Sequence, residues 1–190
     1  MREKSTGFVL LGALAAGGAM TGYELRAWIA QAVGGFWAES FGQIYPALKG
    51  LLEDGLIVAA GGAGEGKPYR ITPAGRTALT AWLARPPQPE RARSELLLKL
   101  HFGRFLGTDT ARGLLAVARD GARDRAQALE TEIARLRAGE LRGEELVFAL
   151  LVAERGLAAA RAERDWAERA LKAIDALENG GPDAALPALR

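Results

Sequence analysis

Apolar residues recur at helical spacing in the first third of the chain, over residues 6–16, 21–32 and 40–53. Such spacing places the apolar side chains on one face of each predicted helix, which is the face that packs into a core. The residues predicted to face inward are Phe8, Leu10, Leu11 and Leu14, then Leu25, Trp28 and Ile29, then Ile44, Leu48, Leu51 and Leu52.

Capping residues support the second and third of these helices. Thr21 precedes Glu24 by three residues and Ser40 precedes Gln43 by three, so both pairs have the form of a capping box. Pro46 then falls beyond the first turn of the third helix, where it would remove a backbone hydrogen bond. Gly55 follows that helix, as expected of a glycine that ends a helix in the left-handed conformation.

A strand-turn-strand pattern follows the third helix. We predict strands at Leu56–Ala60 and Tyr69–Thr72, with the glycine-rich stretch 61–66 as the turn between them. The glycine run lacks the Gly-Lys-Ser/Thr pattern of a nucleotide-binding loop and leads to no helix at the right place, so we exclude that function. A further helix is predicted over residues 73–84, with Ala78, Leu79, Trp82 and Leu83 on one side.

The second half of the chain is predicted to be helical. Pro86, Pro87 and Pro89 lie in a stiff linker, and a short apolar helix after it ends at Gly107. Thr108 or Asp109 is expected to cap a long helix, which Gly139 and Gly143 separate from the last one. Apolar positions three or four apart in both long helices, interrupted once by the charged Arg164, are typical of a coiled coil. They are Leu115, Ala118, Ala122, Ala126, Leu129, Ile133 and Leu136, then Leu146, Leu150, Ala153, Leu157, Ala160, Ala167, Leu171 and Ile174.

The composition restricts the chemistry. The chain has no cysteine and one histidine, His101, which excludes disulfides, thiolate metal sites and multi-histidine clusters. No serine-centred nucleophile motif is present, and Glu95 and His101 are too poorly aligned on a helix to form a catalytic pair. We therefore predict that the protein is not an enzyme and requires no cofactor and no metal.

Location and partners are constrained by apolar run length and by charge. No stretch of about 18 apolar residues could span a membrane, so we expect a cytoplasmic protein with no membrane partner. The net charge is +2, with 8 Lys/Arg and 6 Asp/Glu in residues 1–85 and 17 of each in residues 86–190. The small positive excess in the first part weakly favours a nucleic-acid partner there.

The outward face of the helix at 40–53 carries candidate chemistry. Gly42, Gln43, Pro46, Lys49, Gly50 and Glu53 lie on it, with Tyr45 at its edge. A face without bulky aliphatic residues allows close approach of a grooved partner. A glutamine can bond the edge of an adenine in two places and a lysine can reach a phosphate, so Gln43 and Lys49 are candidates for these contacts. The alternative is a surface helix that only packs.

Several motifs resemble the PadR family of bacterial winged helix-turn-helix regulators. They are the stretches 20–25 (MTGYEL), 36–37 (FW), 40–48 (SFGQIYPAL) and 67–72 (KPYRIT), with Leu51, Gly55-Leu56-Ile57, Gly75, Leu79 and Trp82-Leu83. Residues 93–100 (RSELLLKL) are similar to the start of the helical C-terminal domain of the longer, virulence-activator-type relatives. Phe41 departs from the tyrosine usual in the family, and this wing carries fewer basic residues. The resemblance implies a dimeric DNA-binding protein, usually a repressor, often released by a small molecule.

This reading gives two sets of candidate site residues. A helix before a recognition helix crosses the DNA backbone, and a wing meets phosphate or the minor groove. The predicted DNA-binding residues are Thr21, Tyr23, Ser40, Gly42, Gln43, Tyr45, Lys49, Lys67 and Arg70. The candidate effector pocket comprises Trp28, Trp37, His101, Phe102 and Phe105. Alternatives remain open, because Tyr23 could simply pack, Trp37 could belong to the core or an interface, and His101 could lie on the surface.

We therefore predict a mainly α fold with a small β-wing. Residues 1–85 form a winged helix-turn-helix domain, 86–92 a linker, 93–178 a helical dimerisation and effector domain, and 179–190 a flexible tail. The predicted function is that of a homodimeric repressor on a pseudo-palindromic DNA operator, released by a small-molecule effector. Alternatives are an activator of the same fold, a helical adaptor that has lost DNA binding, and a small-molecule-binding protein without a DNA role.

Overall fold

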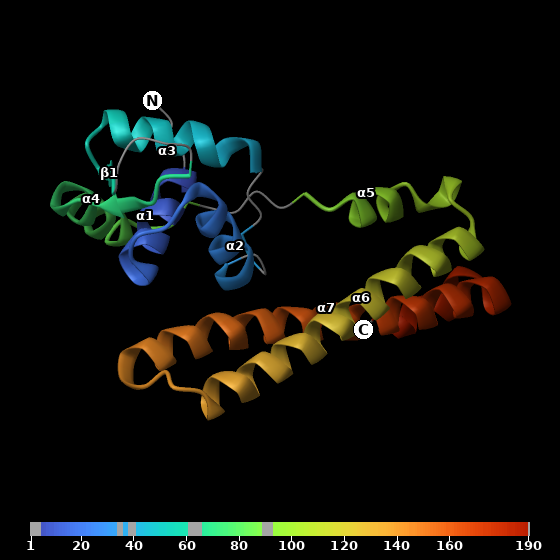
Figure 1. The fold of residues 1–190 in the computed structure, drawn as a ribbon. Helices are drawn as coiled ribbons and strands as arrows, with labels where there is room; N and C mark the ends of the chain where they lie inside the picture. The colour runs from blue at the N-terminus through green and yellow to red at the C-terminus, as the bar shows by residue number, and fades with distance from the viewer. Residues whose placement is uncertain (1–4, 34–35, 38–40, 61–65, 89–92, 190) are drawn as a thin grey trace. The chain divides into compact units, whose positions relative to one another are not determined.

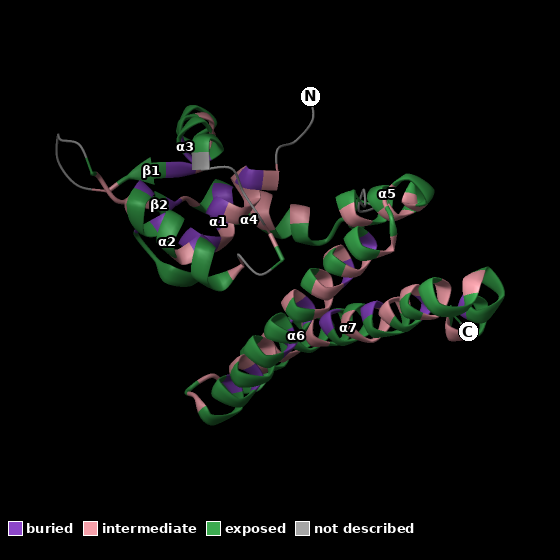
Figure 2. Ribbon diagram, turned by 90° about the vertical axis from the view of Figure 1, so that its right-hand side faces the viewer, coloured by how far each residue is buried: buried purple, intermediate pink, exposed green. Residues whose placement is uncertain are grey.

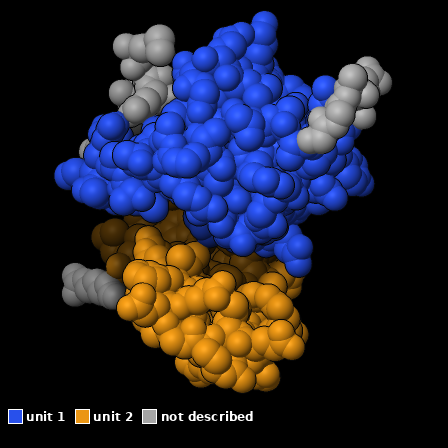
Figure 3. All heavy atoms as spheres, turned by 60° about the vertical axis from the view of Figure 1, so that its left-hand side comes forward, with its two compact units in different colours: residues 1–89 blue, residues 90–190 orange. Residues whose placement is uncertain are grey.

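The computed structural model describes residues 5–33, 36–37, 41–60, 66–88 and 93–189. It is mainly helical, with one small antiparallel sheet (Figure 1). The chain divides into two compact units, residues 1–89 and 90–190, which Figure 3 colours separately. The predicted fold class, mainly α with a β-wing, is confirmed.

The first unit is built around α1 (Ser5–Gly17). Its residues Leu10, Leu11 and Leu14 are buried, and α2 (Gly22–Ala32), α3 (Ile44–Glu53) and α4 (Pro73–Leu83) pack against it (Figure 2). Strands β1 (Ile57–Ala59) and β2 (Tyr69–Ile71) pair antiparallel, with Ile57 opposite Ile71. The core joins residues from all these elements, as the helical spacing predicted.

Threonine side chains cap the starts of α2 and α4. Thr21 caps α2, and its capping box with Glu24 is confirmed. Thr72 caps α4 by accepting a hydrogen bond from the backbone N–H of Gly75, and its hydroxyl donates to the carbonyl oxygen of Gly55. Gly55 ends α3 with a φ of +67°, the left-handed conformation predicted for it.

The start of α3 differs from the prediction. A 3₁₀ turn, Phe41–Gln43, precedes the α-helix, and Gln43 occupies the N-cap position without a side-chain capping bond. The predicted capping box pairs Gln43 with Ser40, which lies outside the described residues, so that pairing stays a prediction. Because the helix begins at Ile44, Pro46 falls in its first turn, where backbone N–H groups have no helical acceptor. The expected loss of a hydrogen bond at Pro46 does not arise.

Two residues expected to face the core are exposed. Leu52, next to Leu51 on α3, is 37% exposed, and Leu83 at the end of α4 is 65% exposed. Trp82 packs α4 against α1, because its ring stacks on that of Phe8 with 4.8 Å between the ring centroids.

The second unit consists of a short helical segment and a long hairpin. The segment comprises α5 (Glu95–His101) and the 3₁₀ turn Gly103–Phe105. Helices α6 (Thr108–Ala138) and α7 (Gly143–Ala185) run antiparallel beside each other (Figure 1). Their contact follows the predicted alanine-rich seam, of which Leu115, Ala122, Ala126, Ile133, Leu136, Ala153, Ala160 and Ala167 are buried. Ala111 and Ala173, which the prediction did not include, are buried as well.

Ion pairs link the two long helices along the seam. Arg125 bonds Glu163 at 2.6 Å, and Arg112 bonds Asp175 at 3.0 Å and also contacts Glu178. These pairs join positions far apart in the sequence, so they fix the register of the hairpin. The carboxylates raise the pKa of Arg112, chiefly through the bonds to Asp175 and Glu178.

Two predictions at the ends of the long helices are wrong. Gly107, with a φ of +79°, occupies the N-cap position of α6, in place of Thr108 or Asp109. The tail was expected to be disordered, yet α7 resumes beyond a break at Gly181 and continues to Ala185, which is buried. A 3₁₀ turn, Leu186–Leu189, follows. The Gly181-Pro182 pair breaks the helical backbone without ending the packing.

Candidate nucleic-acid interface

The outward face of α3 is open to solvent. Gln43 and Lys49 are exposed on it, and Tyr45 is 63% exposed, whereas Ile44 and Leu48 on the opposite face are buried (Figure 2). Gly42 and Pro46 are exposed as well. An exposed helix that carries an amide, a phenol and an ammonium group beside small residues can enter a DNA major groove.

The positive charge of Lys49 is partly balanced by the carboxylate of Glu53 on the same helix. Its Nζ lies 3.8 Å from Glu53 Oε1, one turn further along α3, and both side chains are largely exposed. An exposed pair of this kind contributes roughly 0–1 kcal/mol. A phosphate could therefore compete with Glu53 for the lysine.

The start of α2 places a second polar group of residues at the surface. Tyr23 is 73% exposed in the first turn. The hydroxyl of Thr21 donates to Glu24 Oε2 at 2.9 Å, and the backbone N–H of Thr21 donates to the same oxygen at 2.8 Å. These bonds hold the pKa of Glu24 below its usual range. A phosphate that approached Thr21 would have to displace this carboxylate.

The wing contributes two basic residues. Arg70 is exposed in β2 opposite Val58, and Lys67 is half-buried just before the strand. Both lie at the end of the sheet that leads into residues 61–65, which are outside the described residues. The described strands are shorter than predicted, because the antiparallel ladder extends only from Ile57 to Ala59 and from Tyr69 to Ile71. Met20 adds one further bridge to Tyr69.

The five candidate effector residues are divided between the two units. Trp28 packs on the core of the first unit, and Trp37 is half-buried. In the second unit Phe102 and Phe105 are 54% and 74% exposed, and His101 is exposed with its ring edge-on to Phe102. The pocket assignment remains a prediction.

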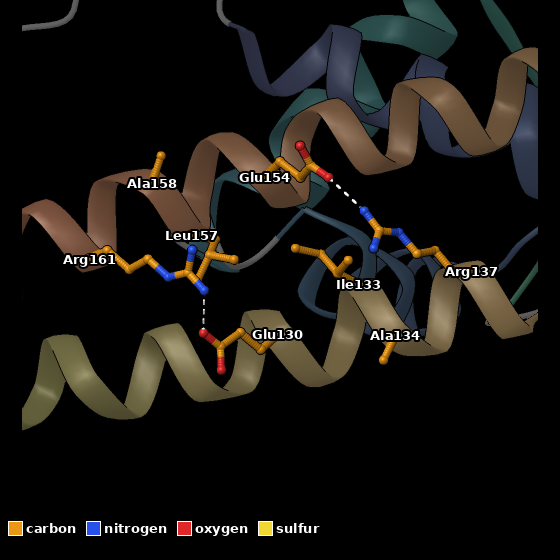
Figure 4. Close-up of a pocket in the computed structure, with 8 residues that line it drawn as sticks. All are labelled: Glu130, Ile133, Ala134, Arg137, Glu154, Leu157, Ala158 and Arg161. Atoms are coloured by element: carbon orange, nitrogen blue, oxygen red, sulfur yellow. Dashed lines mark hydrogen bonds and ion pairs between the residues drawn. The ribbon is translucent and has the colours of Figure 1, made fainter.

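The hollow between α6 and α7 has a different lining (Figure 4). Ile133 and Leu157 form its apolar part, and the ion pairs Glu130–Arg161 at 2.7 Å and Arg137–Glu154 at 3.0 Å cross it. All four charged groups are therefore satisfied by partners across the helix seam. This arrangement joins the two helices and offers no unpaired charge to a ligand.

Sequence reasoning overlooked an apolar stripe on α7. Val147, Phe148, Leu151 and Val152 are between 49% and 66% exposed. Their spacing of one and four residues places them on one face, away from the seam with α6. The sequence does show this stripe, as the apolar pairs Val147-Phe148 and Leu151-Val152 one helical turn apart. These residues lie next to the predicted coiled-coil positions and are not part of them.

The described part of the chain contains neither a metal-binding cluster nor a membrane-spanning helix. No group of three or more His, Cys, Asp or Glu residues that could hold a metal ion occurs there. Among the helices of the described residues, none combines the length and the apolar character that crossing a membrane requires.

Comparison with known families accounts for most of the chain. Residues 10–81 match the transcriptional regulator PadR-like family, and residues 92–175 match the family described as virulence activator alpha C-term. The chain carries a PadR-like domain followed by a virulence-activator-type C-terminal domain. The predicted family and the predicted longer C-terminal domain are both confirmed.

Individual relatives are similar in sequence and in fold. The negative transcriptional regulator PadR of Bacillus subtilis (strain 168) is 35% identical over 100 residues, which span 50% of this PadR-like chain and about half (54%) of that relative. A crystal structure of Bacillus subtilis PadR in complex with operator DNA superposes with a TM-score of 0.76 at 28% identity, covering 90% of this chain and 100% of that one.

Two further structures extend the similarity. Bacillus subtilis PadR in complex with p-coumaric acid has a TM-score of 0.76 at 27% identity, covering 90% of this chain and 99% of that one. The virulence activator AphA of Vibrio cholerae has a TM-score of 0.73 at 26% identity, covering 91% of this chain and 99% of that one. The similarity therefore includes both a negative regulator and an activator.

Proposed function

We propose that this PadR-like chain is a homodimeric repressor that binds a pseudo-palindromic operator and is released by a small-molecule effector. The exposed polar face of α3 carries the DNA-binding part of the proposal, because Gln43 and Lys49 are presented there while Ile44 and Leu48 anchor the helix. The related PadR of Bacillus subtilis has been crystallised with operator DNA.

The proposed contacts divide into base reading and backbone binding. Gln43 bonds a base edge in the major groove, while Tyr23, Lys49, Lys67 and Arg70 bind phosphates on either side. Each phosphate that a lysine or arginine neutralises releases counterions, so binding falls steeply as salt is added. Gly42 lets the helix backbone approach the groove.

The apolar stripe on α7 supports the homodimer. Val147, Phe148, Leu151 and Val152 form a contiguous face that α6 does not cover. A second copy of the chain can cover it by pairing the same face with itself, as in a two-fold symmetric interface. A two-fold dimer would place the two copies of α3 in successive major grooves, about 34 Å apart.

We expect an effector to act by changing the spacing between the two DNA-binding domains of the dimer. A ligand that binds one spacing of the two DNA-binding domains more tightly than another shifts the population by its differential affinity. Trp28, Trp37, His101, Phe102 and Phe105 supply aromatic rings suited to an aromatic ligand. The complex of the Bacillus subtilis relative with p-coumaric acid supports a small-molecule effector of this kind.

Activation is the second candidate function. The match of residues 92–175 to the virulence activator C-terminal family and the similarity to AphA favour it. Deleting the gene separates the two outcomes, because transcripts from the bound promoter rise if the protein represses and fall if it activates.

A gel-shift assay with DNA upstream of the protein's own gene tests DNA binding. Replacing Gln43 with Ala should relax preference at one base pair and weaken specific binding by about 1–3 kcal/mol. Replacing Lys67 with Ala should weaken binding to all sequences alike and reduce the salt slope by about 1. If Gln43→Ala changes neither affinity nor base preference, α3 does not read the operator. If the wild-type chain fails to shift any DNA, the adaptor or small-molecule-binding alternatives apply.

A further inference from the structure

Gly22, the first residue of α2, is buried beneath the ring of Tyr45 from α3. A Cβ placed on Gly22 would lie 2.9 Å from Tyr45 Cε1, 3.3 Å from Cζ and 3.4 Å from the hydroxyl oxygen. The first distance is shorter than a carbon–carbon contact allows. The tyrosine ring therefore occupies the space that a side chain at residue 22 would need.

The backbone at Gly22 does not itself require glycine. Among the described residues, the glycines with positive φ are Gly18, Gly55, Gly66, Gly107, Gly143 and Gly181, and Gly22 is not one of them. Glycine also weakens a helix relative to alanine. The absence of a side chain is thus explained by the tyrosine above it and not by the conformation of the chain.

This contact fixes an otherwise exposed side chain. Tyr45 is 63% exposed, yet its ring rests on the first turn of α2, so its hydroxyl is held near that turn. The neighbouring hydroxyl of Thr21 is already bonded to the carboxylate of Glu24. The Tyr45 hydroxyl, held near this turn, can donate to an incoming anion, as can that of the exposed Tyr23 within the turn.

We propose that Gly22 is a positioning residue for DNA binding: the space above it holds Tyr45 so that the phenol hydroxyl donates to a backbone phosphate beside the start of α2. The inference rests on the proposed DNA-binding function and assigns Tyr45 to the phosphate backbone rather than to the bases. A hydrogen bond to a charged group is worth roughly 1.5–3 kcal/mol, which corresponds to about a 10- to 100-fold change in affinity.

A double-mutant cycle on the operator tests the proposal. Tyr45→Phe removes the hydroxyl and should weaken binding about 10-fold, and Gly22→Ala should weaken it by a similar factor because the added methyl displaces the ring. The double variant should bind no more weakly than Tyr45→Phe alone, since the hydroxyl is lost only once. Neither change should alter base preference or the salt slope, because a neutral donor releases no counterion.

The control is Gly12→Ala, in α1 of the same unit, where an added Cβ meets no atom within 4 Å. This variant should bind as the wild type does. Thermal unfolding identifies a Gly22→Ala chain that is destabilised, and Tyr45→Ala in the same chain should then restore its melting temperature by removing the clash.

The failures are distinguishable. If the wild-type chain does not bind operator DNA, both this inference and the proposed function fall. If it binds, but Gly22→Ala binds equally well or its effect adds fully to that of Tyr45→Phe, only the role of Gly22 is overturned. Failure of Tyr45→Ala to restore a destabilised Gly22→Ala chain would also exclude the steric account.

Discussion

Glu24 links the charge of one carboxylate to the stability of α2. Two hydrogen bonds from Thr21 stabilise the ionised carboxylate of Glu24 and hold its pKa below the usual range. The bond from the backbone N–H has the larger effect and the bond from the hydroxyl the smaller. A carboxyl with a lowered folded-state pKa stabilises the fold at pH values above its unfolded pKa, and this contribution is lost as the pH falls through the folded value. The unfolded value is about 4.3.

We therefore predict a pH-dependent effect of Glu24→Gln. The variant should unfold at a lower temperature than the wild type at pH 7, and the difference should shrink as the pH falls below about 4.3. Tryptophan fluorescence in a Trp166→Phe background would report on residues 1–89, since Trp28, Trp37 and Trp82 all lie there. A difference that stays constant from about pH 7 to about pH 3 would contradict the assignment.

At the residue scale, exposure was easier to predict than contact. The outward position of Gln43, Lys49 and Tyr45 followed from helical periodicity alone, because their side chains lie opposite the buried face. The contact between Tyr45 and Gly22 depends on how closely α2 and α3 approach, and periodicity within one helix contains no such information. The bond from Thr21 to Glu24 was predictable, since a capping box is local in sequence.

At the scale of elements, the junction of α3, β1 and α4 depends on a second glycine. A Cβ on Gly75 would lie 2.1 Å from the backbone carbonyl oxygen of Leu56, where no side-chain movement could relieve the clash. The backbone N–H of Thr72 donates to the same carbonyl oxygen, and the Thr72 hydroxyl caps α4 by accepting from the N–H of Gly75. The wing and α4 are thus joined through backbone atoms.

Replacing Gly75 with Ala should therefore destabilise the first unit. We expect a loss of about 2 kcal/mol, as for overpacking of a closed site. Urea unfolding followed by tryptophan fluorescence in the Trp166→Phe background measures it. The matched Gly12→Ala variant has open space at its Cβ and should be neutral or slightly stabilised through helix propensity. Equal effects of the two substitutions would show that the junction is not closely packed.

Local sequence patterns predicted which segments are helical more accurately than they predicted where each helix begins and ends. Apolar positions three or four apart predicted the seam between α6 and α7, and residues at these positions are buried between the two helices. The start of α3 was misplaced because Phe41–Gln43 form a 3₁₀ turn and the α-helix begins only at Ile44. The exposure of Leu52 and Leu83 depends on how far neighbouring elements extend over each helix, which a helical projection does not contain.

At the scale of the whole molecule, the stripe on α7 makes dimerisation testable. If a second copy covers Phe148 and Leu151, Leu151→Glu should bury an unpaired charge and shift the protein to the monomer. Light scattering coupled to size exclusion measures the mass directly. The control Lys172→Glu changes a charge near the other end of α7 and should leave the mass unchanged. A wild-type chain that is monomeric at working concentration would rule out the dimer.

Dimerisation and DNA binding should also be coupled. Two half-sites bound by one dimer gain affinity from their linkage, so the monomeric Leu151→Glu variant should lose most operator affinity while α3 stays intact. Circular dichroism would confirm that its helices remain folded.

Hydroxyl-radical footprinting on DNA upstream of the protein's own gene tests the central claim most directly. The account predicts protection of two half-sites of an inverted repeat, about 34 Å apart and on one side of the duplex. Gln43→Ala should reduce the protection of both half-sites together. A single protected half-site, or no protection at concentrations where the chain is folded, would contradict the proposal that paired α3 helices read an operator.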